Sequence, residues 1–237
     1  MSGWWESPGC RTHNSFVGIN VANIFPKWTN KIPTAVAIGL PVVLIAVCAF
    51  IWYFFSPKFL EVGYSPKQPV PFSHKLHAGD LGMDCRYCHN TIERSSFAAV
   101  PPTQACMGCH QDLVLPQSPK LAPVRESWVT DKPIPWVNVH MLPDFVKFDH
   151  SAHLASGVGC TSCHGRVDQM KVVMQAKPMS MGWCLECHRN PTPSLRPLDQ
   201  ITNMSYVLDP SKYDPKNDPH RARKEVTPPL HCSGCHM

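Results

Sequence analysis

The sequence lacks the motifs that mark several large enzyme classes. It contains no glycine-rich nucleotide-binding loop and no nucleophile elbow, and it has no second kind of metal motif beside the one described below. These absences argue against nucleotide-dependent chemistry and against hydrolysis by an activated serine. The chain therefore has to be interpreted from its cysteines, histidines and hydrophobic segments.

Charged side chains are missing from residues 32–57, and residues 35–55 are almost entirely apolar. Twenty-one residues at about 1.5 Å per residue cover about 31 Å, the thickness of a hydrocarbon core. No small-x-small cleavage site follows Phe55, which favours an uncleaved anchor over a signal peptide. We expect a tail over residues 1–32, a transmembrane helix over 33–56 and one further domain over 57–237.

Residues 57–237 hold 21 of the 25 prolines. Proline at this density interrupts helices and is excluded from central strands. The composition predicts loops and short helices, which need bound cofactors to become a compact domain.

Ten of the twelve cysteines belong to five copies of the pattern Cys-x-x-Cys-His. We number these motifs 1 to 5 along the chain. The motifs are Cys85/Cys88/His89, Cys106/Cys109/His110, Cys160/Cys163/His164, Cys184/Cys187/His188 and Cys232/Cys235/His236. Two thiols at this spacing can form thioether bonds to a haem, and the next residue supplies the proximal iron ligand.

Zinc and disulfides are the alternatives to haem. The gaps between motifs 1 and 2 and between motifs 3 and 4 fit zinc ribbons. However, a ribbon does not need a histidine after every second cysteine, and motif 5 would have no partner. A disulfide framework explains the even number of cysteines but not the histidines. The pattern therefore predicts a multihaem cytochrome c, with a loop-rich, short-helix domain wrapped around five c-type haems.

Charge does not determine the orientation in the membrane, because lysines flank both ends of the apolar segment. Attachment of c-type haem outside the bacterial cytoplasmic membrane does: the haem domain is expected on the periplasmic side and the tail, with Cys10 and His13, in the cytoplasm. Cys48 is expected only to pack within the helix. The formal net charge of +5 falls close to zero when each oxidised haem adds about −1.

An internal repeat joins the motifs in pairs. Phe72, His74 and His77 precede motif 1 in the pattern FxHxxH, and the same pattern precedes motif 3 at residues 148–153. Residues 72–110 and 148–188 thus resemble two copies of a two-haem unit, with a fifth haem at 232–236. Histidines at i and i+3 share a helix face and can serve two irons. We expect replacement of His77 or His153 to perturb a haem other than that of the nearest motif.

Eight histidines remain after the five proximal ligands. The distal candidates are His74, His77, His140, His150 and His153, one for each iron. His220 and His231 are expected to cap surfaces or to touch propionates. Methionine could replace one distal histidine, and it would raise the potential of that haem. The methionines clustered before motif 4 are Met170, Met174, Met179 and Met181.

Two protein ligands on every iron leave no position for a substrate. This favours electron transfer over catalysis, and the CxxCK variant found in one nitrite reductase family is absent. We therefore expect no catalytic residues in this chain.

Residues 71–110, 140–153 and 181–189 resemble the pentahaem c-type cytochrome of bacterial alternative complex III. The resemblance covers most of residues 65–190 and includes the N-terminal anchor. It implies an electron relay in a quinol-oxidising respiratory or photosynthetic complex of the cell membrane. The implied partners are an iron–sulfur subunit of the molybdopterin oxidoreductase type, polytopic quinol-binding subunits and a monohaem cytochrome c.

Three other functions remain open at this stage. A single-helix multihaem quinol dehydrogenase that feeds a periplasmic reductase would oxidise quinol itself. A related quinone-reductase complex would run electrons inward from a periplasmic cytochrome. A zinc-ribbon interaction protein would carry no haem at all.

Overall fold

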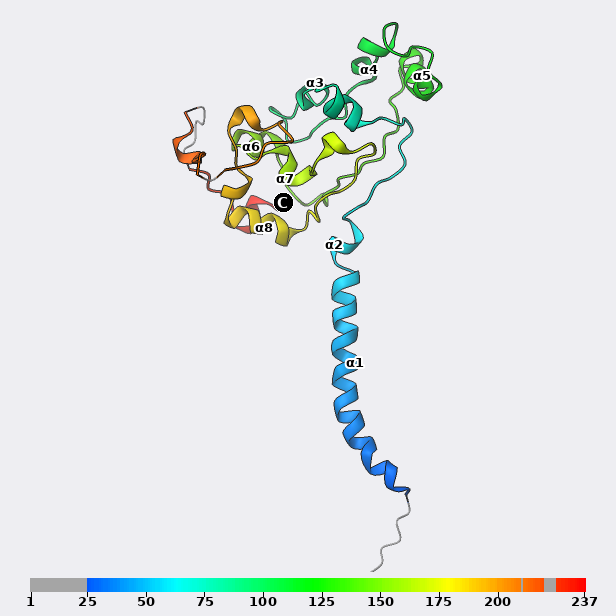
Figure 1. Ribbon diagram of the computed structural model, residues 1–237, viewed down its shortest axis with the longest axis vertical. Helices are drawn as coiled ribbons and strands as arrows, with labels where there is room; N and C mark the ends of the chain where they lie inside the picture. Colours follow the sequence, from blue (N-terminus) through cyan, green and yellow to red (C-terminus); the bar gives the residue numbers. More distant parts are fainter. Residues whose placement is uncertain (1–24, 210, 220–224) are drawn as a thin grey trace, which may run out of the picture. The chain divides into compact units, whose positions relative to one another are not determined.

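The computed structural model describes residues 25–209, 211–219 and 225–237 (Figure 1). Cys10, His13 and His220, for which the sequence suggested roles, lie outside these ranges. The chain divides into two compact units, Met1–Ile51 and Trp52–Met237, and each is treated separately below.

The first unit contains most of a long apolar helix. A short 3₁₀ turn, Lys27–Lys31, leads into α1, Ile32–Phe54, and Pro41 lies inside α1 without ending it. None of the side chains of α1 is buried. At 23 residues the helix is about 35 Å long, so its length and composition suit a membrane span. The helix expected over residues 33–56 is therefore present.

The second unit consists of short helices and loops, as the prolines predicted. The α-helices are α2 (Pro57–Leu60), α3 (Cys85–Cys88), α4 (Thr103–His110), α5 (Ala122–Thr130), α6 (His150–Ala155), α7 (Cys160–His164) and α8 (Met181–Arg189). A π-helical segment, η2, covers Lys75–Asp80. Short 3₁₀ turns lie at Pro119–Leu121, Val167–Gln169, Thr192–Ser194, Leu198–Gln200, Pro215–Asn217 and Cys232–Gly234. Among the described residues, β-pairing is limited to the bridges Val146–His236 and Val158–Leu195.

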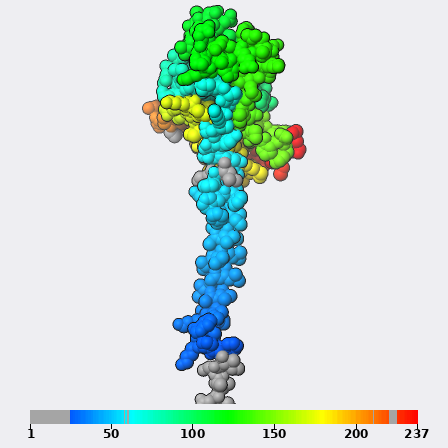
Figure 2. Space-filling model, turned by 90° about the vertical axis from the view of Figure 1, so that its right-hand side faces the viewer, coloured from blue at the N-terminus to red at the C-terminus, as the bar shows by residue number. Residues whose placement is uncertain are grey.

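The C-terminal end pairs with the segment before α6. Lys147 donates its backbone N–H to the carbonyl of Cys235, and Met237 donates to that of Phe145. Figure 2 shows the red C-terminal atoms beside the yellow-green atoms of this segment. Motif 5 is thereby fixed to the chain that carries His140 and the second FxHxxH element.

The hydrocarbon core of the second unit is small. One cluster joins α4 and α5 to two extended segments through Val70, Met107, Val124 and Ile134. In the described part of the chain, the only other buried apolar side chains are Ile92 and Leu195. A domain of this size normally buries a much larger apolar core. The interior therefore needs another apolar component, which five porphyrins would supply.

The repeat inferred from the sequence has a structural counterpart. Gly82 and Gly157, each three residues before the first cysteine of their motif, both have positive φ angles, +67° and +80°. In both copies the residue two before that cysteine donates its N–H to the carbonyl of the second histidine: Met83 to His77, and Val158 to His153.

The copies differ by one residue, and the π-helix accommodates it. Seven residues separate His77 from Cys85, whereas six separate His153 from Cys160. A π-helical turn is an α-helix with one inserted residue. The first copy has its π-helix, Lys75–Asp80, in this interval, while the second copy has the ordinary α-helix α6.

Candidate haem-binding sites

Each of motifs 1 to 4 lies on a helical turn. Cysteines three residues apart point to the same face of a helix, and the following histidine lies close to them. Asp84 caps α3 by accepting the Arg86 N–H at 2.8 Å, and Ser180 caps α8 by accepting the Trp183 N–H at 3.4 Å. In motif 5, a 3₁₀ turn at Cys232–Gly234 performs the same task.

The two FxHxxH elements have nearly the same ring geometry. Phe72 meets His74 edge-on, with centroids 4.8 Å apart, and stacks on His77 at 4.4 Å. Phe148 meets His150 edge-on at 4.7 Å and stacks on His153 at 4.6 Å. The phenylalanine therefore holds two imidazoles in different planes. This orientation lets the two histidines of one element face different sites.

Hydrogen bonds to carbonyls fix the tautomer of six candidate ligands. A carbonyl oxygen can only accept, so a ring Nδ1 beside it must carry the proton, and Nε2 keeps its lone pair for a metal. The six pairs are His77 with Ser73 (2.9 Å), His89 with Ala99 (3.0 Å), His110 with Val114 (2.7 Å), His150 with Ser96 (2.9 Å), His153 with Asp149 (2.7 Å) and His188 with Pro229 (2.8 Å). Three of these six histidines are proximal candidates, and three are distal ones.

Three pairs of imidazoles have the separation that a six-coordinate iron requires. With iron–nitrogen bonds of about 2 Å on both sides, the two ring centroids would lie about 6 Å apart. The centroid distances are 6.3 Å for His77 and His110, 6.1 Å for His153 and His188, and 6.4 Å for His150 and His164. The structure thus brings distal candidates beside the proximal residues of motifs 2, 4 and 3.

His74 lies nearest to the proximal histidine of motif 1. Burial lowers the pKa of His74 to about 4, and the neighbouring His89 and His77 contribute to the decrease. Its Nδ1 is buried without a hydrogen-bond partner. A buried imidazole that stays neutral can serve as a ligand.

His140 does not pair as simply. Its ring meets that of His164 edge-on with centroids 4.6 Å apart, which is too close for both to bind one iron from opposite sides. Burial, followed by the effect of His150, lowers the pKa of His140, and its Nε2 is buried without a partner. His236 of motif 5 instead stacks on Phe145 at 5.8 Å. By elimination, we keep His140 as the candidate ligand for motif 5.

His164 lies at the centre of the histidine cluster. Burial lowers its pKa to about 3, and His140, His150, His89 and His74 act in the same direction. Its imidazole is therefore neutral at physiological pH and able to bind a metal. The first motifs of the two copies are thus close together in space.

The methionine alternative gains no support from exposure at two of its four positions. Met174 is 42% exposed and Met181 is 65% exposed. Met170 and Met179 are half-buried. His231, expected at the surface, is exposed.

The zinc alternative requires four converging ligands. Within the part of the chain that the structure describes, no group of three or more Cys, His, Asp or Glu side chains could hold one metal ion. The histidines meet in pairs instead, which is the arrangement that haem iron needs.

Sequence reasoning missed residues 194–203, for which no motif gave a signal. Arg196 is buried, and its guanidinium donates to Thr161 inside motif 3 at 2.7 Å and to the carbonyl of Asn203 at 3.0 Å. A Cβ at Gly159 would overlap this guanidinium, so a glycine is needed directly before Cys160. This segment clasps motif 3.

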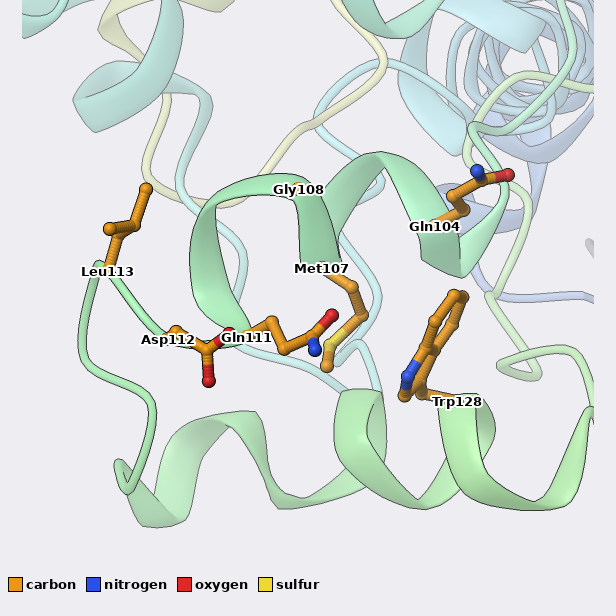
Figure 3. A pocket seen from close by; sticks show the side chains of 7 residues that line it. All are labelled: Gln104, Met107, Gly108, Gln111, Asp112, Leu113 and Trp128. Atoms are coloured by element: carbon orange, nitrogen blue, oxygen red, sulfur yellow. The ribbon is translucent and has the colours of Figure 1, made fainter.

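A shallow cavity of about 490 Å³ lies between α4 and α5 (Figure 3). Met107 and Gln111 of α4 point toward Trp128 of α5 there. At 100° per residue, these side chains leave α4 on the side away from Cys106 and Cys109. The cavity is therefore separate from the face that would carry a haem.

Comparisons with known proteins agree with this chemistry. Residues 146–237, which include motifs 3 to 5, match the family described as cytochrome c7 and related cytochrome c. Over 122 residues the chain is 39% identical to the multihaem cytochrome c subunit of the menaquinone reductase of Nitratidesulfovibrio vulgaris. The aligned part is 51% of this chain and 55% of that protein, so the match spans about half of each.

The class that the motifs and the comparisons define is a multihaem c-type cytochrome. The residues fit this cofactor on three structural grounds: a small hydrocarbon core, imidazoles paired at the required distance, and Nε2 atoms left available by Nδ1 hydrogen bonds.

Proposed function

We propose that the chain carries five c-type haems and acts as an electron relay. The thioether bonds would come from the ten motif cysteines and the proximal ligands from the five motif histidines. The single observation that carries this proposal is the set of three imidazole pairs with centroids 6.1–6.4 Å apart.

The residues of the chain perform three tasks in this function. The carbonyls of Ser73, Asp149 and Pro229 orient the imidazoles of His77, His153 and His188 and hold the proton on Nδ1. The paired rings occupy both axial positions, which excludes water and substrate. When bound, haem supplies an iron that gains and loses one electron. The chain is then a non-catalytic relay.

The location follows from the apolar helix and the attachment chemistry. We propose that α1 spans the cell membrane once, with residues 57–237 on the periplasmic side and residues 1–32 in the cytoplasm. Its length of 23 residues and the absence of charge support this assignment.

We further propose that the chain belongs to a quinol-oxidising complex of the alternative complex III type. Quinol would be oxidised on polytopic partner subunits, and electrons would arrive through an iron–sulfur subunit. They would leave to a monohaem cytochrome c or another soluble acceptor. The resemblance of residues 71–110, 140–153 and 181–189 supports this assignment.

A second candidate rests on the menaquinone reductase subunit to which the chain is 39% identical. In a complex of that kind, electrons would run from a periplasmic donor toward quinone. The same relay serves either direction, and the potentials of the partners decide between them.

Purification of the native protein from membranes in mild detergent, followed by haem staining and mass spectrometry, tests this proposal. We expect an iron–sulfur subunit, polytopic proteins and a monohaem cytochrome c to co-purify, together with quinol oxidation. Quinone reduction by a reduced periplasmic cytochrome would support the second candidate. Isolation of the chain alone, still oxidising quinol, would contradict the relay role and move the quinol site onto this chain.

A further inference from the structure

The spatial order of the five motifs can be derived from the contacts between them, if the proposed function holds and each motif carries a haem. The order along the chain is 1-2-3-4-5. The contacts show a different order in space.

Motifs 1 and 2 are neighbours. His77, on the helix directly before motif 1, places its ring 6.3 Å from that of His110 in motif 2. The cysteines agree with this contact: burial raises the pKa of Cys88, and the nearby Cys85 and Cys109 raise it further.

Motif 1 also adjoins motif 3. The Cys160 N–H donates to the carbonyl of Ile201 at 3.2 Å, and the next residue, Thr202, donates its hydroxyl to Asp84 at 2.8 Å. Asp84 directly precedes Cys85, so residues 201–202 link the first cysteines of the two motifs. The side chains of Cys85 and Cys160 also hydrogen-bond to each other.

The contact between the two copies is reciprocal. Lys75, which follows His74, donates its N–H to the carbonyl of Met170 at 2.9 Å. Ser151, which follows His150, donates to the carbonyl of Ser95 at 3.3 Å. Met170 and Ser95 each lie six residues after the proximal histidine of the other copy. Each copy thus binds the other through equivalent residues, as the subunits of a two-fold dimer do, and this places motifs 1 and 3 at the centre.

Motif 3 is followed in space by motif 4. His153, on the helix before motif 3, lies 6.1 Å from His188, and the bridge Val158–Leu195 joins the chain before motif 3 to the chain after motif 4. Burial raises the pKa of Cys163 to about 11, with contributions from Cys187 and Cys184.

Motif 4 in turn adjoins motif 5. The Nδ1 of His188 donates to the carbonyl of Pro229, three residues before Cys232. Burial raises the pKa of Cys184, and the next contribution comes from Cys235.

Exposure marks the two ends of this series independently. Among the ten motif cysteines, Cys109 of motif 2 and Cys232 of motif 5 are exposed, while the other eight are half-buried. The motifs that have one neighbour each are therefore also the ones with an exposed cysteine.

We propose that the motifs form a linear series in the order 2-1-3-4-5, with motifs 2 and 5 at its ends. The interface between the two copies lies inside the series, between motifs 1 and 3. Electrons enter at one end and leave at the other, and motif 1 is an internal step although it comes first in the chain.

Two haem-deletion variants of the full-length, haem-loaded protein in detergent distinguish this order from the chain order. In Cys85→Ser/Cys88→Ser, motif 1 is empty and motif 2 loses its neighbour. In Cys106→Ser/Cys109→Ser, motif 2 is empty and the remaining series stays continuous. Cys232→Ser/Cys235→Ser removes an end in both orders and is the matched control. After a limiting pulse of reductant, the spread of electrons among the remaining haems is followed by absorbance.

We expect a slow phase with the absorbance of one haem in the motif 1 variant, and none in the motif 2 variant or the control. The reverse result, with the slow phase only in the motif 2 variant, would overturn the order. Fewer than five haems on the wild-type chain, measured by mass, would instead reject the proposed function.

A variant that keeps all five haems covers the case in which the deletions do not fold. His77→Met raises the potential of the motif 2 haem, which is then reduced first and loses its magnetism. We expect the paramagnetic resonance signal of the motif 1 haem to change and that of the motif 3 haem to stay constant. A change at motif 3 would contradict the order 2-1-3-4-5.

Discussion

At the scale of single residues, the histidines of the FxHxxH elements determine which sites are joined. His77 and His153 each lie on the helix before one motif and face the proximal histidine of the next motif, His110 and His188. Each element therefore connects the two sites of its own copy. The sequence predicted this function from the i, i+3 spacing, and the ring distances support it.

Replacement of His77 or His153 by methionine should change the haems of motifs 2 and 4, because the lost imidazoles face His110 and His188. We expect the potential of one haem to rise in each variant, with motifs 1 and 3 unaffected. Redox titration monitored by paramagnetic resonance measures this. The exposed His231 is the control, since His231→Met should leave every potential unchanged. The pairing would be wrong if the haem of motif 1 or motif 3 shifted instead.

The ring planes predict distinct magnetic signals for the haems. The planes of His150 and His164 differ by 9°, whereas those of His77 and His110 differ by 65°. Parallel ligand planes split the iron d orbitals strongly, and crossed planes leave them nearly degenerate. The oxidised protein should therefore show both a rhombic low-spin signal and a highly anisotropic one. A single signal type for all haems would contradict the assigned pairs.

At the scale of elements, the π-helix Lys75–Asp80 and α6 are the two versions of one part. The π-helix packs against the turn Val167–Gln169 so closely that a Cβ at Gly79 would overlap the carbonyl oxygen of Asp168. Gly79 therefore permits the contact between the copies. The extra residue that forms the π-helix was visible in the sequence as the seven-residue gap, but its conformation was not.

Gly79→Ala should destabilise the protein by about 1–3 kcal/mol, because a backbone carbonyl cannot move aside as a flexible side chain can. Gly182→Ala is the matched control: it lies in α8 with open space around the added Cβ, and helix propensity predicts no loss and up to about 1 kcal/mol of gain. Denaturant unfolding of the two haem-loaded variants provides the comparison. Equal midpoints would show that the contact at Gly79 carries no weight.

At the scale of the whole molecule, local patterns predicted more than long-range contacts did. The Cys-x-x-Cys-His motifs, the apolar helix and the repeat depend on residues close in sequence, so their spacing alone indicated them. Arg196 reaches Thr161 across 35 residues, and Pro229 reaches His188 across 41. Such contacts depend on how loops close around the sites, and neither residue belongs to a pattern that identifies its role.

The spatial order of the motifs could not be predicted for the same reason. It depends on Thr202 reaching Asp84, 118 residues away, and on reciprocal backbone hydrogen bonds that any residue type could make. Backbone donors and acceptors are common to nearly every residue. The sequence therefore indicates which sites exist, and only the fold indicates which sites adjoin.

The number of covalently bound haems tests the central claim most directly. Intact-mass spectrometry of the mature full-length chain, purified from membranes and denatured, compares its mass with that of the bare 26.5 kDa polypeptide. The account predicts an excess equal to five haems, which stays bound in denaturant because thioether bonds are covalent. An excess of four haems or fewer, or a chain without haem that retains zinc or disulfides, would contradict it.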